Sequence, residues 1–153
     1  MKKMTKTQVA WFVIALAILA ALGWLSPNAY STSANDRFGH RVSISDTHAI
    51  VGAYSEDDGG GNTSGKAYIF DVTTGNLVYT LDNPNAYSTS GNDRFGYAVS
   101  ISTTYAIVGA YFEQDAGGSA SGKAYIFNLS DGSLAYTLDN PNAYGTSNSD
   151  YFG

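Results

Sequence analysis

The pattern of apolar and polar residues divides the chain into two unlike parts. Between Val9 and Leu25 no charged residue interrupts an apolar run, so a helix formed there is apolar on every face. After this run no helical period recurs, and short segments alternate between the two residue classes. In Tyr97–Ser102, for example, large apolar or aromatic residues occupy every second position. The pattern predicts one N-terminal helix followed by an all-β region.

The predicted strands occur in groups of four, separated by turn residues. Residues 105–112 follow a two-residue turn after the first strand of one group. They are apolar on both faces and rich in Ala and Gly, as expected of a strand covered on both sides. A glycine-rich loop and the turn 130–132 separate the remaining strands. The four strands of this group are predicted at residues 97–102, 105–112, 123–129 and 133–138.

Each group of strands belongs to an internal duplication with a period of 57 residues. Similar segments beginning PNAY start at Pro27, Pro84 and Pro141, and 41 of 57 positions are identical between the first two units. A tandem four-stranded unit of this length is typical of a β-propeller blade. A β-solenoid and a duplicated β-sandwich are the alternatives. A single blade cannot bury both of its faces, so neighbouring units are expected to pack together.

The repeated motifs resemble those of a known family. Each complete unit contains VSIS, AIVGAY and SGKAYIF, and the pair Phe-Gly occurs at residues 38–39, 95–96 and 152–153. These motifs are similar to the FG-GAP repeat, named for a Phe-Gly pair and a downstream Gly-Ala-Pro, although tyrosine replaces the proline here. The resemblance covers residues 27–153. It implies the propeller fold found in integrin α subunits and in bacterial and archaeal surface proteins.

The repeat and the resemblance together predict the domain organisation. Residues 1–25 are expected to be a signal peptide or an N-terminal membrane anchor, and residues 26–39 a lead-in loop with the start of the repeat. Residues 40–96 form the first expected blade. Residues 97–153 form the second, which ends at the start of a third repeat that is cut short. Because propellers close with about four to eight blades, we expect a fragment that self-associates through its open blade edges.

The N-terminal segment predicts export from the cytoplasm. Lys2, Lys3 and Lys6 precede the apolar run, which is typical of an export signal or a membrane anchor. The run is short for a spanning helix and long for a signal-peptide core, so residues 9–25 either are removed or hold the chain in a membrane. A buried helix of a soluble domain is the third alternative. Both export readings predict a secreted or cell-surface protein.

Composition excludes several kinds of site. After residue 25 the chain carries 13 acidic and five basic residues with no basic stripe, which argues against a nucleic-acid partner. The chain has no cysteine, so it forms neither a disulfide nor a thiolate metal site. His40 and His48 are the only histidines, and tyrosine takes their places in the second unit, so packing rather than acid–base chemistry is expected. We expect no catalytic residue.

Acidic loops after the Gly-Ala-Tyr motifs are candidates for binding calcium. Flexible glycines beside carboxylates suit a cation that accepts irregular oxygen geometry; a solvated loop is the alternative. The family's usual calcium loop lies between the first two strands, where this chain has only four-residue links, 45–48 and 102–105. That site is therefore not carried over, and calcium is the single cofactor left open. Its candidate ligands are Glu56, Asp57, Asp58, Glu113 and Asp115.

The resemblance and the leader together predict a non-enzymatic adhesion or ligand-binding module outside the cell. Tyr30, Tyr87 and Tyr144, in the PNAY segments, are candidates for an exposed aromatic set that binds a protein or a glycan. The alternative for these rings is packing in the seams between blades. Two other functions are open: a surface-layer or filament component anchored by the N-terminal helix, and part of an extracellular propeller enzyme whose site lies in further repeats.

Overall fold

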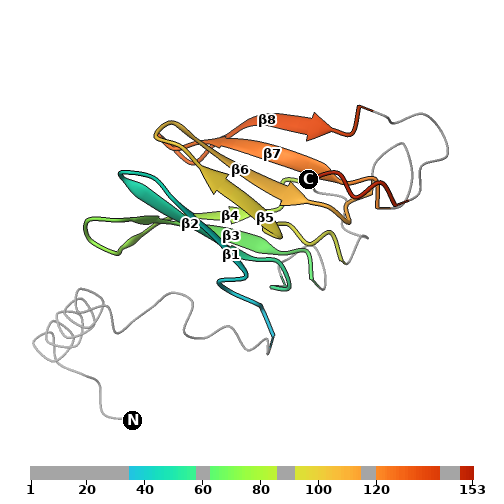
Figure 1. Cartoon of the computed structure of the whole chain (residues 1–153), viewed down its shortest axis with the longest axis horizontal. Coiled ribbons are helices and arrows are strands. Elements are labelled where there is room, and N and C mark those ends of the chain that lie inside the picture. The colour runs from blue at the N-terminus through green and yellow to red at the C-terminus, as the bar shows by residue number, and fades with distance from the viewer. Residues whose placement is uncertain (1–34, 58–62, 86–91, 115–119, 142–148) are drawn as a thin grey trace, which may run out of the picture. The chain divides into compact units, whose positions relative to one another are not determined.

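Eight strands form two four-stranded sheets in the computed structural model of the chain (Figure 1). The structure describes residues 35–57, 63–85, 92–114, 120–141 and 149–153, all within one compact unit, residues 33–153. The predicted N-terminal helix and the leader, residues 1–25, lie outside the described residues. Within these described ranges no helix is long and apolar enough to cross a membrane.

Each repeat unit supplies one sheet, in which every strand pairs with the next along the chain. The first sheet contains β1 (Arg41–Ile44), β2 (His48–Ala53), β3 (Lys66–Asp71) and β4 (Leu77–Asp82). The second sheet contains β5 (Ala98–Ile101), β6 (Tyr105–Ala110), β7 (Lys123–Asn128) and β8 (Leu134–Asp139).

The two sheets have the same register. All neighbouring strands are antiparallel, and the cross-strand pair Val51 and Tyr68 recurs as Val108 and Tyr125. Even the irregularity between β3 and β4, after Ile69, recurs at the equivalent place between β7 and β8. The all-β prediction is confirmed, and the antiparallel pairing differs from the parallel coils of a β-solenoid.

Side-chain acceptors build the turns at the ends of β3 and β7. The Asp71 carboxylate accepts hydrogen bonds from the amides of Thr73 and Thr74 at 3.0 and 2.7 Å. The Asp131 carboxylate accepts one from the amide of Ser133 at 2.9 Å. Hydroxyl donors, Thr74 for Asp71 and Ser133 for Asp131, contribute most to holding the pKa of each aspartate below its usual range. Such local bonds explain why Asp and Thr or Ser end these strands.

Strand alternation gives each sheet two apolar faces, which we call front and back. In the first sheet Val42 on β1 lies opposite Val51 on β2, and both belong to the front. Ile50 on β2 lies opposite Ile69 on β3, and both belong to the back. The equivalent residues, 57 positions later, define the same faces of the second sheet.

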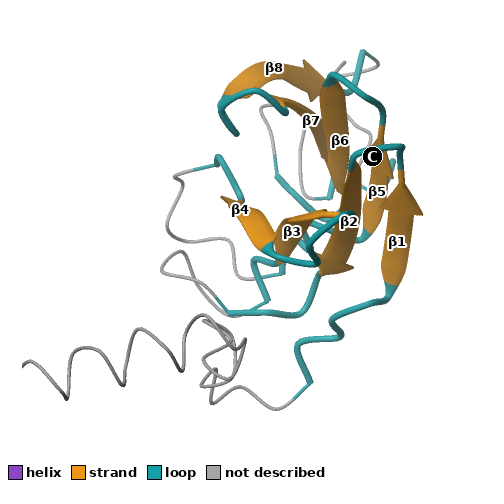
Figure 2. Cartoon of the chain, turned by 90° about the vertical axis from the view of Figure 1, so that its left-hand side faces the viewer, coloured by secondary structure: helices purple, strands orange, loops and turns teal. Residues whose placement is uncertain are grey.

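The core lies between the back of the first sheet and the front of the second, which face each other (Figure 2). Its members from the first sheet are Ile50, Ala67, Ile69 and Leu81. Its members from the second unit are Phe95, Ala106, Val108, Ala110, Tyr125, Phe127 and Leu129. Most of the buried apolar side chains lie at this junction, so each unit supplies one half of a shared core.

The Phe-Gly segment before β5 connects the two sheets. The amides of Arg94 and Phe95 donate to the carbonyls of Thr63 and Ser64 in the first unit, at 3.2 and 2.9 Å. The Phe95 ring is fully buried and lies 5.8 Å from the ring of Tyr125 in its own unit. The segment therefore binds one sheet through its backbone and the other through its side chain.

The third Phe-Gly segment contacts the second unit in the same way. The amides of Tyr151 and Phe152 donate to the carbonyls of Ala120 and Ser121, both at 3.1 Å. In addition, Asn140 donates to Asp150 at 3.0 Å, as Asn83 does to Asp93 at 2.9 Å. Each of these aspartates thus bonds to an asparagine ten residues upstream, at the end of the preceding sheet.

Candidate functional site

A glutamate at the same position of each acidic loop, Glu56 in the first unit and Glu113 in the second, points inward. The Tyr68 hydroxyl donates to Glu56 at 2.6 Å, and the Tyr125 hydroxyl donates to Glu113 at 2.5 Å. Burial contributes most to raising the pKa of both tyrosines, so they stay protonated as donors.

Lysines complete both glutamate clusters. Lys66 lies 3.7 Å from Glu56 and 3.4 Å from Asp82, and the equivalent Lys123 lies 3.8 Å from Glu113 and 3.0 Å from Asp139. Each glutamate side chain thus contacts a tyrosine and a lysine of its own β3 or β7. The contacts are those of a structural junction beside the core.

Glu113 lies in the more strongly buried of the two clusters. Its side chain is fully buried, whereas that of Glu56 keeps 11% of its surface exposed. The pKa of Glu113 is raised to about 7, because the effect of burial, with that of the nearby Asp93, outweighs the opposing effects of Tyr125 and Lys123. Its Oε2 atom has no hydrogen-bond partner within the described part of the chain. Near neutral pH this carboxyl is therefore a mixture of protonated and ionised forms.

The remaining calcium candidates lie apart from these clusters or outside the described residues. The Asp57 carboxylate accepts a hydrogen bond from the amide of Thr63 at 2.7 Å. Asp58 and Asp115 lie outside the described residues. Among the residues that the structure describes, no group of three or more His, Asp or Glu side chains is placed to hold a metal ion. Calcium binding by these loops stays a prediction.

Six aromatic rings form a continuous row across the two units, which we call the aromatic ladder. It consists of His40, Tyr54, Tyr97, Tyr111, Phe112 and Tyr151. The His40 ring lies 4.7 Å from Tyr54 and 5.0 Å from Tyr97, and Tyr97 lies 4.3 Å from Tyr111. Phe112 continues the row to Tyr151 at 5.4 Å. Tilted and edge-on pairs at these spacings are favourable, so the rings support one another.

Three arginines lie over the aromatic ladder. Arg37 lies 5.7 Å from the ring centre of Tyr54, and Arg41 lies 5.9 Å from that of Tyr97. Arg94 lies 4.7 Å from the ring centre of Phe112, and its guanidinium also donates to the Tyr111 hydroxyl. These are distances at which cation–π attraction operates. They are the only arginines in the sequence.

Two of the three arginines over the ladder, Arg37 and Arg94, have an unusual backbone conformation. Arg37 and Arg94 have φ angles of 56° and 57°, and the equivalent Tyr151 has 54°. Residues other than glycine rarely adopt this left-handed region. The amide of Tyr97 then closes a turn onto the Arg94 carbonyl at 3.1 Å, with Gly96 at φ 88° inside it. Strained positions of this kind are frequent at functional sites.

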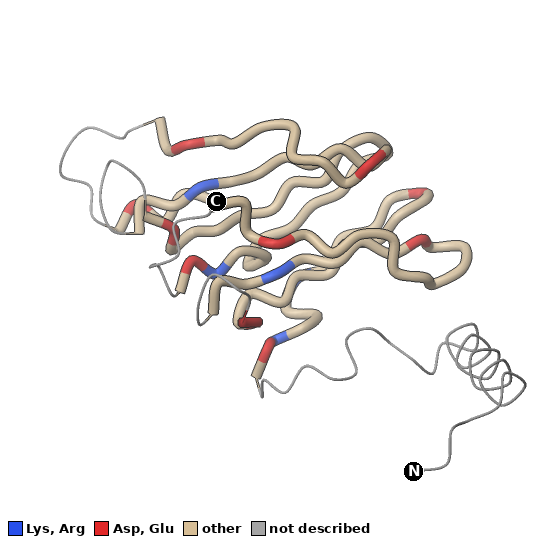
Figure 3. The backbone as a smooth tube through the Cα atoms, turned by 180° about the vertical axis from the view of Figure 1, so that it is seen from behind, with Lys and Arg blue, Asp and Glu red and all other residues tan. Residues whose placement is uncertain are grey.

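The ladder is also electrostatically distinct from the rest of the described chain. Lys66 and Lys123 are held in ion pairs with glutamate and aspartate. Arg37 and Arg41 are exposed, and no described carboxylate lies within ion-pair distance of them. Acidic residues lie at both ends of the sheets, and the basic residues lie toward one of these ends, with acidic residues near them (Figure 3). The ladder therefore offers aromatic surface with free positive charge on an acidic molecule.

Part of this surface was indicated by the amino-acid sequence. The expected ligand-binding tyrosines, Tyr30, Tyr87 and Tyr144, lie outside the described residues. His40 was expected to pack as a ring, and it does so between two tyrosines. The signal that could have identified the ladder is the recurrence of rings at the first strand and after Gly-Ala in both units.

Comparison with known families bears on this architecture. The sequence model of the FG-GAP repeat matches residues 29–70 and 86–127, which make up more than half of the chain. The chain belongs to the FG-GAP repeat family. The matched ranges contain the first three strands of each sheet except the last residue of the third, so the two sheets are FG-GAP units of a propeller-type module. No curated protein matches the chain.

Proposed function

We propose that this FG-GAP chain is a non-enzymatic binding module of an exported or surface-anchored propeller, and that its aromatic ladder holds a protein or glycan ligand. The ladder carries this proposal. Tyrosine and arginine are enriched among the residues that dominate binding energy at interfaces, because they combine large rigid surfaces with polar ends.

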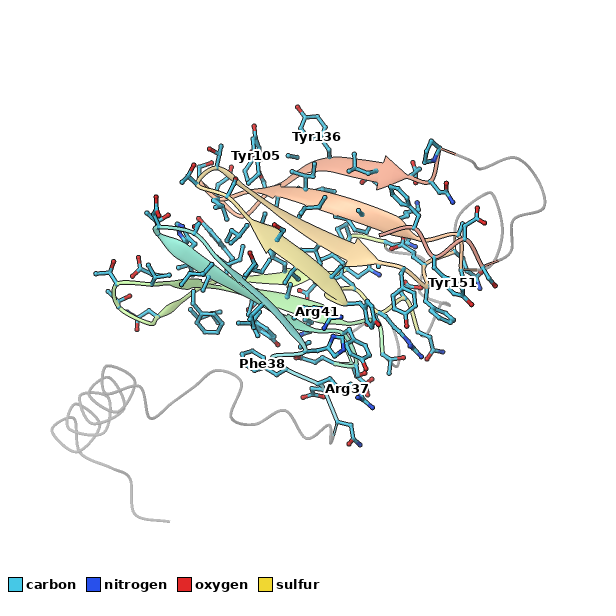
Figure 4. The ribbon with its side chains drawn as sticks, in the orientation of Figure 1. Arg37, Phe38, Arg41, Tyr105, Tyr136 and Tyr151 are labelled. Atoms are coloured by element: carbon cyan, nitrogen blue, oxygen red, sulfur yellow. The ribbon has the colours of Figure 1, made fainter. Side chains whose placement is uncertain are left out.

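The geometry of the ladder supports a ligand with acidic groups. Arg37 and Arg41 project from the first sheet, and Tyr151 lies at the far end of the row (Figure 4). Tyr151 keeps 48% of its surface exposed, so its ring offers an accessible face. An arginine fork binds carboxylates or sulfates in a bidentate manner, and flat rings stack on sugar or side-chain faces.

A non-enzymatic role is supported by the duplication of the buried polar groups. The glutamate, tyrosine and lysine clusters occur once in each unit with the same contacts. A catalytic centre combines unlike groups at a single place, whereas repeated clusters suit a structural role. The basic leader and apolar run of residues 1–25 support export.

A binding assay with the full chain in non-ionic detergent tests this proposal. Immobilised heparin, alginate and a panel of extracellular-matrix proteins serve as probes, and the double variant Arg37→Gln, Arg41→Gln removes two exposed charges of the ladder. We expect at least one probe to bind the wild-type chain and to lose about tenfold in affinity with the variant, roughly 1.4 kcal/mol.

A matched control separates the ladder from net charge. The double variant Thr73→Glu, Ser130→Glu adds two negative charges at exposed turns away from the ladder, so it changes the net charge by the same amount. It is expected to bind as the wild type does at moderate ionic strength. Equal losses in both double variants, or no binding to any probe, would refute the proposed function.

A further inference from the structure

The duplication leaves two apolar faces of the described structure uncovered. Within the chain, Ile50 on the back of the first sheet and Phe95 at the front of the second are both fully buried. Their equivalents are exposed: Ile107 keeps 37% of its surface and Phe38 keeps 55%. Near-identical residues thus lie buried at the internal junction and open to solvent at the two outer faces.

We call the uncovered surfaces the open front and the open back. The open front, on the first sheet, contains Phe38, Val42 and Ile44, with 55%, 66% and 72% of their surfaces exposed. The open back, on the second sheet, contains Tyr105, Ile107 and Tyr136, with 44%, 37% and 61% exposed. Phe38 and the pair Tyr105 and Tyr136 lie on opposite sides of the two sheets (Figure 4).

The open back is shaped to receive another sheet. It contains a shallow hollow lined by Ser100, Ser102, Tyr105, Ile107, Ile126 and Tyr136. At the equivalent place on the first sheet, Ile50, Ile69 and Tyr79 pack against the second unit. The occupant of that internal position is an FG-GAP sheet presenting its front, including Val99 and Ile101.

We propose that a second copy of this chain docks its open front onto the open back of the first, repeating the internal junction between the two sheets. Val42 and Ile44 of the incoming copy occupy the positions that Val99 and Ile101 occupy within one chain. The interface is continuous with an existing one and uses the same residue types, since 41 of 57 positions are identical. The proposal is independent of the ligand bound by the aromatic ladder.

A glycine contact at the internal junction shows how closely the faces match. A side chain at Gly132, in the turn before β8, would come within 2.6 Å of the Tyr79 ring on the first sheet. The equivalent glycine on the open front, Gly75, has open space around it, and the equivalent tyrosine on the open back is Tyr136. In the docked pair, the Tyr136 ring of one copy packs on Gly75 of the next.

The third Phe-Gly segment occupies part of the same junction. The amide of Phe152 already donates a hydrogen bond to Ser121 of its own chain. The equivalent bond at the internal junction runs from Phe95 to Ser64. Residues 36–39 of an incoming copy are equivalent to residues 150–153 and would compete for this place. Because residues 150–153 are tethered to the site, they keep it. Phe152 then covers Tyr68 and Phe70 of the incoming copy, where Phe38 packs in the free chain.

The proposed contact is heterologous, because it joins two different faces. Such contacts add copies in one direction until the rotation closes a ring. Each added copy extends the row of sheets in the way that blades follow one another in a propeller. A symmetric contact between two open fronts would stop at two copies and leave both open backs exposed.

Mixing two half-blocked variants tests this direction of assembly. Ile44→Lys places a charge on the open front, and Tyr136→Lys places one on the open back; both residues are exposed, so the sheets stay folded. Native mass spectrometry of full chains in non-ionic detergent measures the copy number. We expect two or more copies for the wild type, one copy for each variant alone, and a complex with one chain of each variant in the mixture.

The double variant Ile44→Lys, Tyr136→Lys measures association through residues 1–25 alone and is expected to be monomeric. Circular dichroism identifies any variant that fails to fold, and Val42→Lys or Ile107→Lys then replaces it on the same face. A wild-type monomer, a double variant as large as the wild type, or a mixture without the paired complex overturns the proposal. Pairing of Tyr136→Lys with itself overturns it as well, because that result indicates a front-to-front contact.

Discussion

Glu113 shows how the same residue differs between the two units at the scale of a single side chain. Both glutamates accept a hydrogen bond from tyrosine and lie near a lysine. Glu113 alone is fully buried, and Asp93 and Asn83 are among the residues that influence its pKa. A carboxyl that loses its water resists ionisation unless its partners replace that water completely.

This burial predicts a specific dependence of stability on pH. The pKa of Glu113 is about 7 in the folded chain and about 4.5 when exposed, so between these values the folded state holds a proton that the unfolded state has lost. The free energy of unfolding therefore falls as pH rises from about 4.5 to 7, by about 3 kcal/mol. Glu113→Gln removes this loss while keeping an acceptor for Tyr125. Urea unfolding followed by circular dichroism at pH 5 and pH 8 measures the difference.

We expect Glu113→Gln to gain stability over the wild type at pH 8, and the gain to shrink at pH 5. Lys123 keeps its ion pair with Asp139 at 3.0 Å in the variant. Glu56→Gln is the control, because Glu56 has the same tyrosine and lysine contacts but is more exposed to solvent. A stability difference between Glu113→Gln and wild type that is constant from pH 5 to pH 8 would contradict the assignment.

At the scale of the elements, the Phe-Gly segment before β5 is the main link between the sheets. Phe95 is enclosed by both units, whereas Phe38 keeps 55% of its surface exposed and packs on the first sheet, at 5.6 Å from Tyr68 and 6.4 Å from Phe70. The two phenylalanines share a motif but differ in environment. Comparing them therefore separates the contribution of the junction to stability from that of the motif.

Phe95→Ala is therefore expected to destabilise the chain by about 3–5 kcal/mol, as for a fully buried aromatic ring. Phe38→Ala is expected to cost about 1–2 kcal/mol, because half of its ring is already in water. Thermal and urea unfolding of the two variants, at a concentration where the chain is monomeric, measure both values. Equal costs would show that the internal junction adds nothing to the motif.

Strands and turns that depend on neighbouring residues were predictable from the sequence. The period of two in Tyr97–Ser102 and the turn residues around Asp131 predict β5 and the end of β7 directly, and both are confirmed. The inward position of Glu56 was not predicted, because this residue lies beside two aspartates in a glycine-rich loop. One signal was available: glutamate recurs at Glu113, whereas Asp57 is replaced by a glutamine.

The aromatic ladder was also beyond sequence reasoning, for a geometric reason. His40 and Tyr54 flank strands of the first unit, and Tyr97 and Tyr111 flank strands of the second. Their contact depends on the distance and rotation between the sheets, which no single strand encodes. The repeat predicts that the rings recur, and only the packing of the units shows that they touch.

For the whole molecule, the uncovered faces link stability to concentration. Association through the open front and the open back buries apolar surface only in the folded state, so it stabilises folding by mass action. A tenfold higher chain concentration adds up to about 1.4 kcal/mol, which raises the midpoint of thermal unfolding by about 2–5 °C. Differential scanning calorimetry of the full chain over a hundredfold range of concentration measures this shift.

Ile44→Lys is the matched control, since it blocks the open front without altering the core between the sheets. Its midpoint is expected to be independent of concentration and to equal that of the wild type at high dilution. A wild-type midpoint that does not change with concentration would show that the chain unfolds as an isolated monomer.

The shared register of the two sheets has a consequence for how the chain reaches its native state. Because β4 and β8 pair with their neighbours at equivalent positions, either strand can complete either sheet with nearly the same backbone hydrogen bonds. During folding, a strand from the other unit or from another chain can therefore form a non-native pairing that is nearly as favourable as the native one. Only the positions at which the units differ, such as Val78 and Ala135, distinguish the native strand pairing from this non-native one.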